Sequence, residues 1–248
     1  MNSIHIIAQG KGGVGKTIIS AMLAHYFKDK GLPVTCIDTD AVNQTFSLYK
    51  SLKPQNINLF QEEQVDAAAF DSVIEQMVTT ENNFVVDNGA SSFVPLAEYI
   101  TENQIIDLLN DHGKVVYFHI PVTGGPAQLD TLSGMRGLIS SLSQNANFVI
   151  WENRFFGDIH EGGKSFKDMS VYQQTAERID QVISFGQNKK FFLSDFSKMH
   201  KEKLSFDEAI SSGKFPIMSK QRLKMLQREI YVQLDDAFKP LGLEEDQQ

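Results

Sequence analysis

The feature that most constrains the fold is a glycine-rich octapeptide near the N-terminus. Residues 10–17 read GKGGVGKT and match the phosphate-binding pattern G-x-x-x-x-G-K-[ST] at every fixed position. The octapeptide follows an apolar run over residues 4–8, which reads as a strand, and opens a helical pattern over residues 16–30. A strand, a glycine-rich loop and a helix in this order predict an α/β protein that binds a nucleotide.

The loop has a defined chemistry. Glycines let the backbone approach phosphate oxygens with the N–H groups pointing inward, and the helix adds its N-terminal dipole. We expect Lys16 to reach the terminal phosphates of ATP and the Thr17 hydroxyl to bind Mg²⁺. The alternative is a glycine-rich turn that binds nothing, and the completeness of the pattern disfavours it. The expected nucleotide contacts are Gly12, Gly13, Val14, Gly15, Lys16, Thr17 and Ile18.

Short β-branched runs alternate with helical patterns along much of the chain. Further strands are predicted at residues 34–37, 84–86, 114–120 and 147–151. Helices are predicted at residues 67–80, 95–111, 125–143 and 219–238, with a capping box at Ser205 and Glu208 and a long loop over 153–167. This order predicts a mostly parallel twisted sheet with helices on both faces. We predict one domain over residues 1–240 and a frayed acidic tail over 241–248.

Composition narrows the class of protein. A formal net charge of -8 disfavours a protein held on nucleic acid by bulk charge alone, although a local basic face stays open. The single cysteine, Cys36, excludes an internal disulfide and fits a reducing compartment. The six histidines lack ligand-like spacing, so zinc and iron–sulfur sites are not expected. No apolar run has the length of a membrane span, which favours a cytoplasmic protein without stable membrane association.

The strand over residues 84–86 leads directly into Asp87, which is the form of a Walker B motif. Asp87 is therefore expected to hold Mg²⁺ through a water molecule. A strand followed by aspartate is common by chance, so this signal only supports the phosphate loop. Residues 88–90 would then begin a switch segment that senses the γ-phosphate.

Lys11 refines the class. With a second lysine directly after the first glycine, the loop KGGVGKT resembles the deviant Walker A group of P-loop ATPases, the SIMIBI proteins of the MinD and ParA type. The resemblance implies an ATP-dependent homodimer in which Lys11 crosses the interface and touches the phosphates bound by the partner. Lys11 would then neutralise charge in the transition state. A solvated loop lysine is the plain alternative.

The same resemblance assigns roles to polar residues at strand ends. It implies that Asp40 positions or activates the attacking water and is a candidate magnesium ligand, with Asp38 and Asn43 in support. It also implies that Asn153 reads the adenine edge, which suits an amide carrying donors and acceptors. Asp38 as a turn cap and Asn153 as a routine loop residue remain open. The proline that often follows this aspartate in the family is replaced by Ala41.

Longer stretches narrow the resemblance. The segments CIDTDAVNQTF, VVDNGASSFVPL, VTGG and IMSKQRLKMLQREI are similar to plasmid-encoded conjugal transfer ATPases of the TraL type and to plasmid-stability ATPases of the StbB type. This similarity implies a bacterial ATPase switch in conjugative transfer or plasmid positioning. Hydrolysis of ATP to ADP would be slow without a partner from the conjugation or plasmid-maintenance apparatus.

Three alternatives remain. A ParA-type partition ATPase would bind nonspecific DNA as its ATP dimer, with Arg222, Lys224 and Arg228 contacting phosphates, although a solvated helix face explains these cations equally. A membrane-cycling protein of the MinD type is disfavoured because the sequence ends in LEEDQQ. A metabolic ligase or kinase would need a small-substrate pocket, and no residue constellation indicates one.

Overall fold

A computed structural model describes residues 2–40, 43–61, 64–186 and 190–239. Its main sheet has seven strands in the order β11-β8-β7-β1-β6-β2-β3, and every neighbouring pair is parallel. The predicted parallel α/β fold is therefore confirmed. The expected tail at 241–248 and Ala41 lie outside the described ranges. The strands are β1 (Asn2–Ile7), β2 (Val34–Asp38), β3 (Gln55–Asn56), β6 (Asn83–Asp87), β7 (Lys114–Thr123), β8 (Asn147–Asn153) and β11 (Gln181–Phe185).

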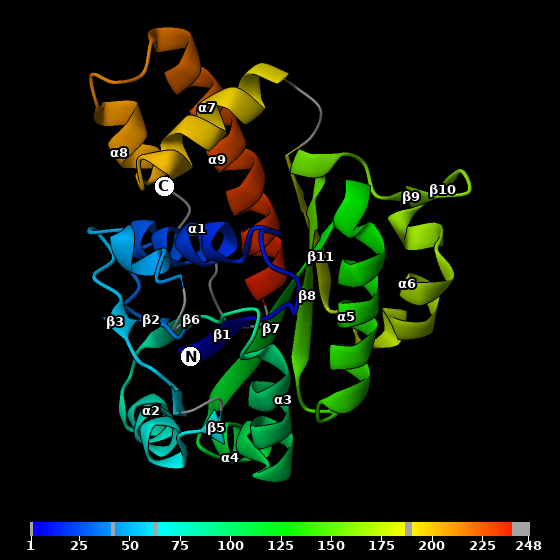
Figure 1. Cartoon of the computed structure of the whole chain (residues 1–248). Coiled ribbons are helices and arrows are strands. Elements are labelled where there is room, and N and C mark those ends of the chain that lie inside the picture. The colour runs from blue at the N-terminus through cyan, green and yellow to red at the C-terminus, as the bar shows by residue number, and fades with distance from the viewer. Residues whose placement is uncertain (1, 41–42, 62–63, 187–189, 240–248) are drawn as a thin grey trace.

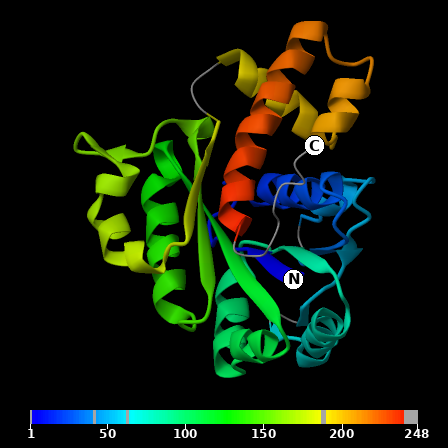
Figure 2. The same cartoon turned by 180° about the vertical axis from the view of Figure 1, so that it is seen from behind.

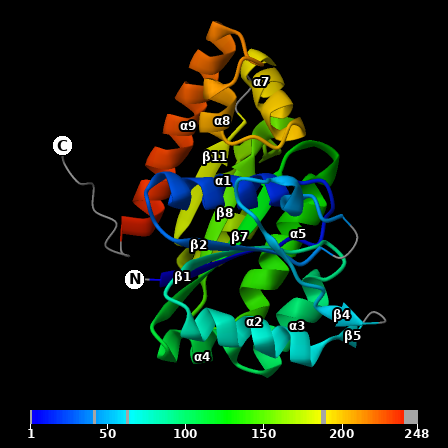
Figure 3. The same ribbon diagram turned by 90° about the vertical axis from the view of Figure 1, so that its left-hand side faces the viewer.

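Helices cover both faces of this sheet, and each face has its own apolar core (Figures 1 and 3). The helices of one face are α2 (Ala67–Thr79), α3 (Phe93–Glu102), α4 (Ile105–Asp111) and α5 (Gln128–Ser141). Those of the other face are α1 (Lys16–Asp29), α7 (Lys190–Lys201), α8 (Phe206–Ser211) and α9 (Ile217–Phe238). Because α1 lies between the sheet and α7–α9, ten of its fourteen residues are buried. No helix in the described ranges combines the length and apolarity that a bilayer span requires.

Three details differ from the sequence prediction. The helix expected over residues 95–111 is broken into α3 and α4, because Gln104 adopts a left-handed conformation with φ of 52°. The loop expected over 153–167 contains a small hairpin of β9 (His160–Glu161) and β10 (Lys164–Ser165), followed by a short helix, α6 (Ser170–Thr175). The edge strand β11 and helix α7 were not predicted. A further small hairpin joins β4 (Phe60–Gln61) to β5 (Gln64–Val65).

A chain of buried hydrogen bonds crosses the centre of the sheet on its α1 side. The Trp151 indole donates to His119 Nδ1 at 2.9 Å, so His119 carries its proton on Nε2 and donates to His5 Nδ1, also at 2.9 Å. His5 Nε2 then donates to the Ser3 hydroxyl at 2.7 Å, and Ser3 donates to Asn83 Oδ1 at 2.8 Å. Every donor has an acceptor only while both imidazoles are neutral. Burial accordingly lowers the pKa of His119 to about 3 and that of His5 well below its usual value.

This relay predicts sensitivity to acid. The unfolded state takes up protons on His5 and His119 near pH 6.5 while the folded state excludes them, so their stabilising contribution is complete above that pH and falls as the pH drops. At pH 5, His119 alone should cost about 2 kcal/mol of unfolding free energy. Urea unfolding at pH 7 and pH 5 measures the net loss, to which His25 and His200 add in the same direction because burial lowers their pKa values to about 4 and about 3. The Asp87 carboxyl opposes it, because burial raises its pKa to about 7. Histidine NMR signals that titrate near pH 6.5 at both positions would contradict the relay.

Candidate nucleotide-binding site

A cleft of about 570 Å³ opens at the carboxyl ends of the central strands. The phosphate loop forms one wall, and the segments that follow β2 and β6 form the other. In parallel α/β sheets this edge is where ligands bind. The lining residues are Gly12, Gly13, Gly15, Lys16, Thr17, Ile18, Asp40, Asn43, Thr45, Ala90 and Ser91.

The loop has the backbone of an anion cradle. Gly13 and Gly15 have φ of 75° and 99°, a left-handed conformation that a side chain would strain. Gly15 stands at the N-cap of α1, where no side chain accepts a hydrogen bond from the first turn. Since the first N–H groups of a helix need acceptors, a phosphate at this position would satisfy them.

Lys16 lies inside the loop and is almost fully buried. Its Nζ donates to the carbonyl oxygens of Gln9 at 3.0 Å and Lys11 at 3.1 Å. Desolvation lowers the pKa of Lys16, and the carboxylates of Asp87 and Asp40 oppose this effect. The ammonium is thus fixed in place at the point where the loop would surround a phosphate.

Asp87 is buried among hydroxyl groups. Its two carboxylate oxygens accept from Thr17 at 2.7 Å and from Ser20 at 2.9 Å, and Thr17 Oγ1 is 3.0 Å from Thr45 Oγ1. Burial raises the pKa of Asp87 to about 7. These hard oxygen donors fit Mg²⁺, which would stabilise the ionised carboxylate. Thr17 and Asp87, both predicted from the sequence, would hold the ion, and Thr45 adds a third oxygen.

The segment after β2 is held by Asp38. One oxygen of this buried carboxylate accepts from the Asp40 backbone at 3.1 Å, and the other accepts from the backbone and hydroxyl of Ser47, each at 3.0 Å. Asp38 therefore orders the turn, as its alternative interpretation proposed. The Asp40 carboxylate accepts from the Asn43 backbone at 2.9 Å and lies so close to Gly89 that a Cβ there would be 3.1 Å from Asp40 Cγ. The two predicted switch segments are thus in contact.

Lys11 points away from the cleft wall. Its Nζ forms an ion pair with Asp130 of α5 at 2.7 Å, and both side chains are about half exposed. The contact across a dimer interface stays a prediction, and in the single chain the lysine has an intramolecular partner.

Asn153 is buried at the end of β8 beneath the phosphate loop. Its Nδ2 donates to the Val14 carbonyl at 3.0 Å, and its Oδ1 accepts from the Phe155 backbone at 3.1 Å. A Cβ on Gly15 would lie 2.8 Å from the amide nitrogen. The side chain thus supports the loop directly. The reading of adenine stays a prediction, and it would require these bonds to be exchanged for bonds to the base.

Three further residues support the site and carry no distinctive signal in the sequence. Ser20 donates to the Asp87 carboxylate, and the Thr45 hydroxyl contacts the Thr17 hydroxyl. Hydroxyl residues at such positions are too common for the sequence to single them out. Gln9 links three parts of the chain: its Nε2 donates to the carbonyls of Pro121 and Thr131, each at 3.0 Å, and its Oε1 accepts from the Gly10 backbone at 2.9 Å. The start of the phosphate loop is therefore anchored to β7 and α5.

This anchor predicts different results for two glycines of α5. A Cβ on Gly134 would lie 2.2 Å from Gln9 Oε1, whereas a Cβ on Gly137 would meet nothing within 4 Å. Gly134→Ala must displace Gln9 and break its bonds, so we expect the Kd for MgATP to rise about tenfold, the cost of roughly one hydrogen bond. Calorimetry measures the Kd, and Gly137→Ala is the matched control. Equal affinities for the two variants would show that Gln9 does not position the loop.

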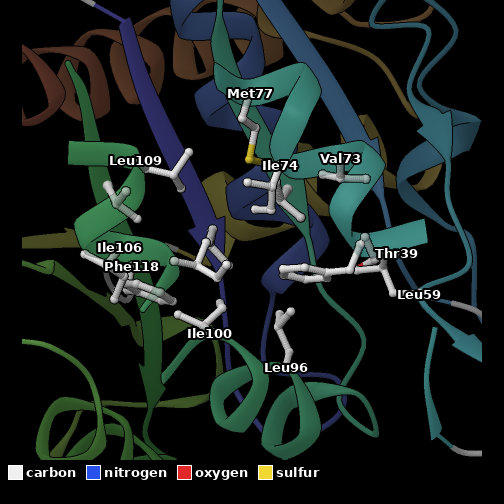
Figure 4. Close-up of a pocket in the computed structure, with 15 residues that line it drawn as sticks. Thr39, Leu59, Val73, Ile74, Met77, Leu96, Ile100, Ile106, Leu109 and Phe118 are labelled. Atoms are coloured by element: carbon white, nitrogen blue, oxygen red, sulfur yellow. The ribbon is translucent and has the colours of Figure 1, made fainter. Parts of the chain in front are cut away.

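The loop after β7 packs against residues 156–158 of the same chain. Cβ atoms on Gly124 and Gly125 would lie 2.4 and 2.9 Å from the backbone oxygens of Gly157 and Phe156. On the α2–α4 side of the sheet, apolar side chains enclose a cavity of only about 30 Å³ (Figure 4). A space of this size is too small for a metabolite.

The parallel sheet, the glycine loop with Lys16, and the buried Asp87 beside Thr17 define a P-loop nucleotide-binding protein. Residues 5–189 match the family described as the CobQ/CobB/MinD/ParA nucleotide binding domain. The chain belongs to this family.

Full-length relatives narrow the comparison. Two Escherichia coli proteins named TraL are 42% and 39% identical to this chain over 238 residues, which covers 96% of the chain and 99% of each relative. Similarity to solved structures supports the fold of this chain and nothing more specific. A chain of the MinC:MinD cell division protein complex of Aquifex aeolicus aligns with a TM-score of 0.55 at 16% identity, covering 99% of this chain and 98% of that one. MinD of Pyrococcus horikoshii with Mg-ADP aligns with a TM-score of 0.52 at 16% identity and full coverage of both chains.

Proposed function

We propose that this protein is an ATP-dependent dimerising ATPase that acts as a switch in plasmid conjugative transfer or plasmid positioning. The observation that carries the proposal is Lys11. It stands at the rim of the phosphate loop, half exposed, and is held only by a surface ion pair with Asp130. Such a pair is worth about 0.2–1 kcal/mol. The lysine can therefore leave it at little cost to contact phosphates bound by a second copy.

The proposed mechanism assigns one task to each group of the cleft. Lys16 and the loop N–H groups bind the β- and γ-phosphates, and Thr17 with Asp87 holds Mg²⁺. Asp40 accepts a proton from, or orients, the attacking water. Because Asp40 lies against Gly89, a γ-phosphate beside it would be sensed by both switch segments at once. ATP then favours the conformer that dimerises, and hydrolysis releases the dimer.

The TraL relatives support the biological setting. Similarity over nearly the full length of both chains is more specific than a shared phosphate loop, so we place this protein in plasmid transfer or maintenance, in the cytoplasm of a bacterium. Partners from the transfer apparatus would recognise the ATP dimer.

Binding of nonspecific DNA is the alternative function. Of its candidate cations, Arg222 is already bound to Asp195 at about 2.5 Å, while exposed Met225 lies between Lys224 and Arg228 in the sequence. A cationic surface interrupted by apolar side chains is better suited to a protein than to phosphates. We therefore retain the protein-directed switch.

The test uses Asp40→Ala with Mg-ATP and with Mg-ADP. We expect light scattering of dilute protein at high salt to give a dimer only with ATP, and we expect that dimer not to bind double-stranded DNA across a salt series. Asp111→Ala, an exposed carboxylate on another face, is the control and should hydrolyse ATP normally. A monomer in both nucleotides, or an Asp40→Ala protein that hydrolyses ATP at the normal rate, would refute the proposal. Salt-sensitive DNA binding would instead support the partition alternative.

A further inference from the structure

The two faces of the sheet differ in charge. Residues 54–113, which include α2, α3 and α4, contain eleven aspartates and glutamates, of which Asp87 is buried, and no lysine or arginine. Residues 190–238, which span α7, α8 and α9, contain nine lysines and arginines and seven aspartates and glutamates. The two groups of helices lie on opposite sides of the sheet (Figure 3). A strongly acidic surface and a surface of mixed charge therefore point away from each other.

The acidic face carries a groove of about 460 Å³ between α3 and α5. Glu98 and Glu102 of α3 stand exposed along it, and neither forms an ion pair with another described residue. Val94 is 56% exposed at the same groove, an unusual position for a large apolar side chain without a partner. The apolar lining consists of Phe93, Val94, Ala97 and Leu138.

The opposite face carries an exposed apolar stripe on α9, and two of its side chains, Met225 and Val232, border a shallow hollow of about 600 Å³ together with Arg228 and the exposed Glu229. Met218, Met225 and Val232 are 60%, 49% and 52% exposed and follow one another at intervals of seven residues along α9. This interval is two helical turns, so the three side chains form one stripe on the solvent side of the helix. Lys224 and Arg228 are exposed beside the stripe, and neither has an ion-pair partner among the described residues. Figure 2 shows α9 running past β11 on the side of the sheet away from α5.

We propose that the Met218–Val232 stripe of α9 docks into the α3–α5 groove of a second copy of this chain. The ten residues of α3 span about 15 Å, so the groove accommodates two neighbouring stripe residues, which are about 10 Å apart, and not the whole stripe of about 21 Å. Lys224 and Arg228 then face Glu98 and Glu102 across the contact. Since groove and stripe lie on opposite faces, they cannot meet within one molecule.

The contact joins unlike surfaces, so it is heterologous and builds chains of molecules head to tail. It uses side chains of α3 and α5 and not the phosphate loop or residues 88–90 themselves, but the groove borders the loop, because Gly134 lies against Gln9 and Phe93 lies close to Gly10. The test therefore has to separate this contact from the proposed nucleotide-dependent dimer. Nucleic acid and a lipid surface fit the stripe less well. Both would use its cations, but neither accounts for an apolar groove with free carboxylates on the opposite face.

The test uses full-length protein in Mg-ADP, where the proposed ATP dimer does not form. Two charge-reversed proteins are needed: Glu98→Lys with Glu102→Lys, and Lys224→Glu with Arg228→Glu. In sedimentation velocity the average mass of the unaltered protein should rise with concentration and fall with salt. Each reversed protein alone should remain monomeric. An equal mixture should associate again, because each groove in the mixture then finds a stripe of opposite charge.

The control is Glu75→Lys with Asp111→Lys, which changes two exposed carboxylates of the acidic face outside the groove by the same charge. It should associate like the unaltered protein. A monomeric unaltered protein, a mixture that stays monomeric, or equal losses in the control would each overturn the contact. So would monomeric protein that binds DNA through Lys224 and Arg228. None of these results depends on whether ATP drives dimerisation, so the two proposals fail separately.

Discussion

Lys16→Ala should lower the affinity for MgATP by about a hundredfold, which corresponds to the loss of about 3 kcal/mol of charge-assisted hydrogen bonding. The affinity should fall because of where the Lys16 ammonium lies. The Lys16 ammonium is buried inside the loop and held by two carbonyl oxygens, so a phosphate that enters the loop meets a fixed positive charge. Calorimetry with MgATP and with MgADP measures the change.

The control for this substitution is Lys30→Ala. Lys30 stands at the opposite end of α1 and forms an exposed ion pair with Asp235 at 2.7 Å, so its loss should leave nucleotide affinity unchanged. Circular dichroism must show that both variants fold. If folded Lys16→Ala binds MgATP as tightly as the unaltered protein, the loop is not the phosphate site.

The parts of this site that the sequence reveals are those encoded within a few neighbouring residues. The phosphate loop has a fixed spacing, and Asp87 follows the apolar run over residues 84–86, so local patterns are enough to predict both. The parallel sheet also follows from such patterns, because each β-branched run lies next to a helical one. Local periodicity therefore yields both the fold class and the chemistry of the cleft.

Contacts between distant residues could not be predicted in this way. Gln9 anchors the loop to Thr131, 122 residues away, and glutamine at that position has no distinctive local signal. The short strand β11 follows a stretch without clear alternation. Its edge is completed by α9, since the Gln233 amide accepts from the Ser184 backbone N–H at 2.8 Å and donates to its carbonyl at 3.1 Å. Such side-chain bonds to a strand leave no pattern in the sequence.

The structure gives Lys11 a partner within its own chain, which the family resemblance did not predict. The family pattern implies a lysine that reaches a partner, and the structure shows where the lysine rests otherwise, on Asp130 at 2.7 Å. In the proposed dimer, Lys11 would have to leave this ion pair in each copy. The lysine contact and the ion pair would then compete, and Asp130 would oppose dimerisation by the small free energy of an exposed pair.

Lys11→Ala should keep its affinity for MgATP, lose the ATP-dependent dimer, and hydrolyse ATP about a thousandfold more slowly, the lower end of the effect of a cationic group supplied in trans. Asp130→Asn should act in the opposite direction and strengthen the ATP dimer about twofold to fivefold for each ion pair removed. Light scattering gives the dimer constant, and phosphate release gives the rate.

The pair of variants separates the two roles of Lys11. If Lys11 is only a solvated loop residue, neither substitution changes dimerisation. If it acts only through Asp130, the two substitutions change dimerisation in the same direction. Opposite changes in the dimer constant of the two variants would mean that the Lys11 ammonium binds either Asp130 or the phosphates of the partner, but not both at once.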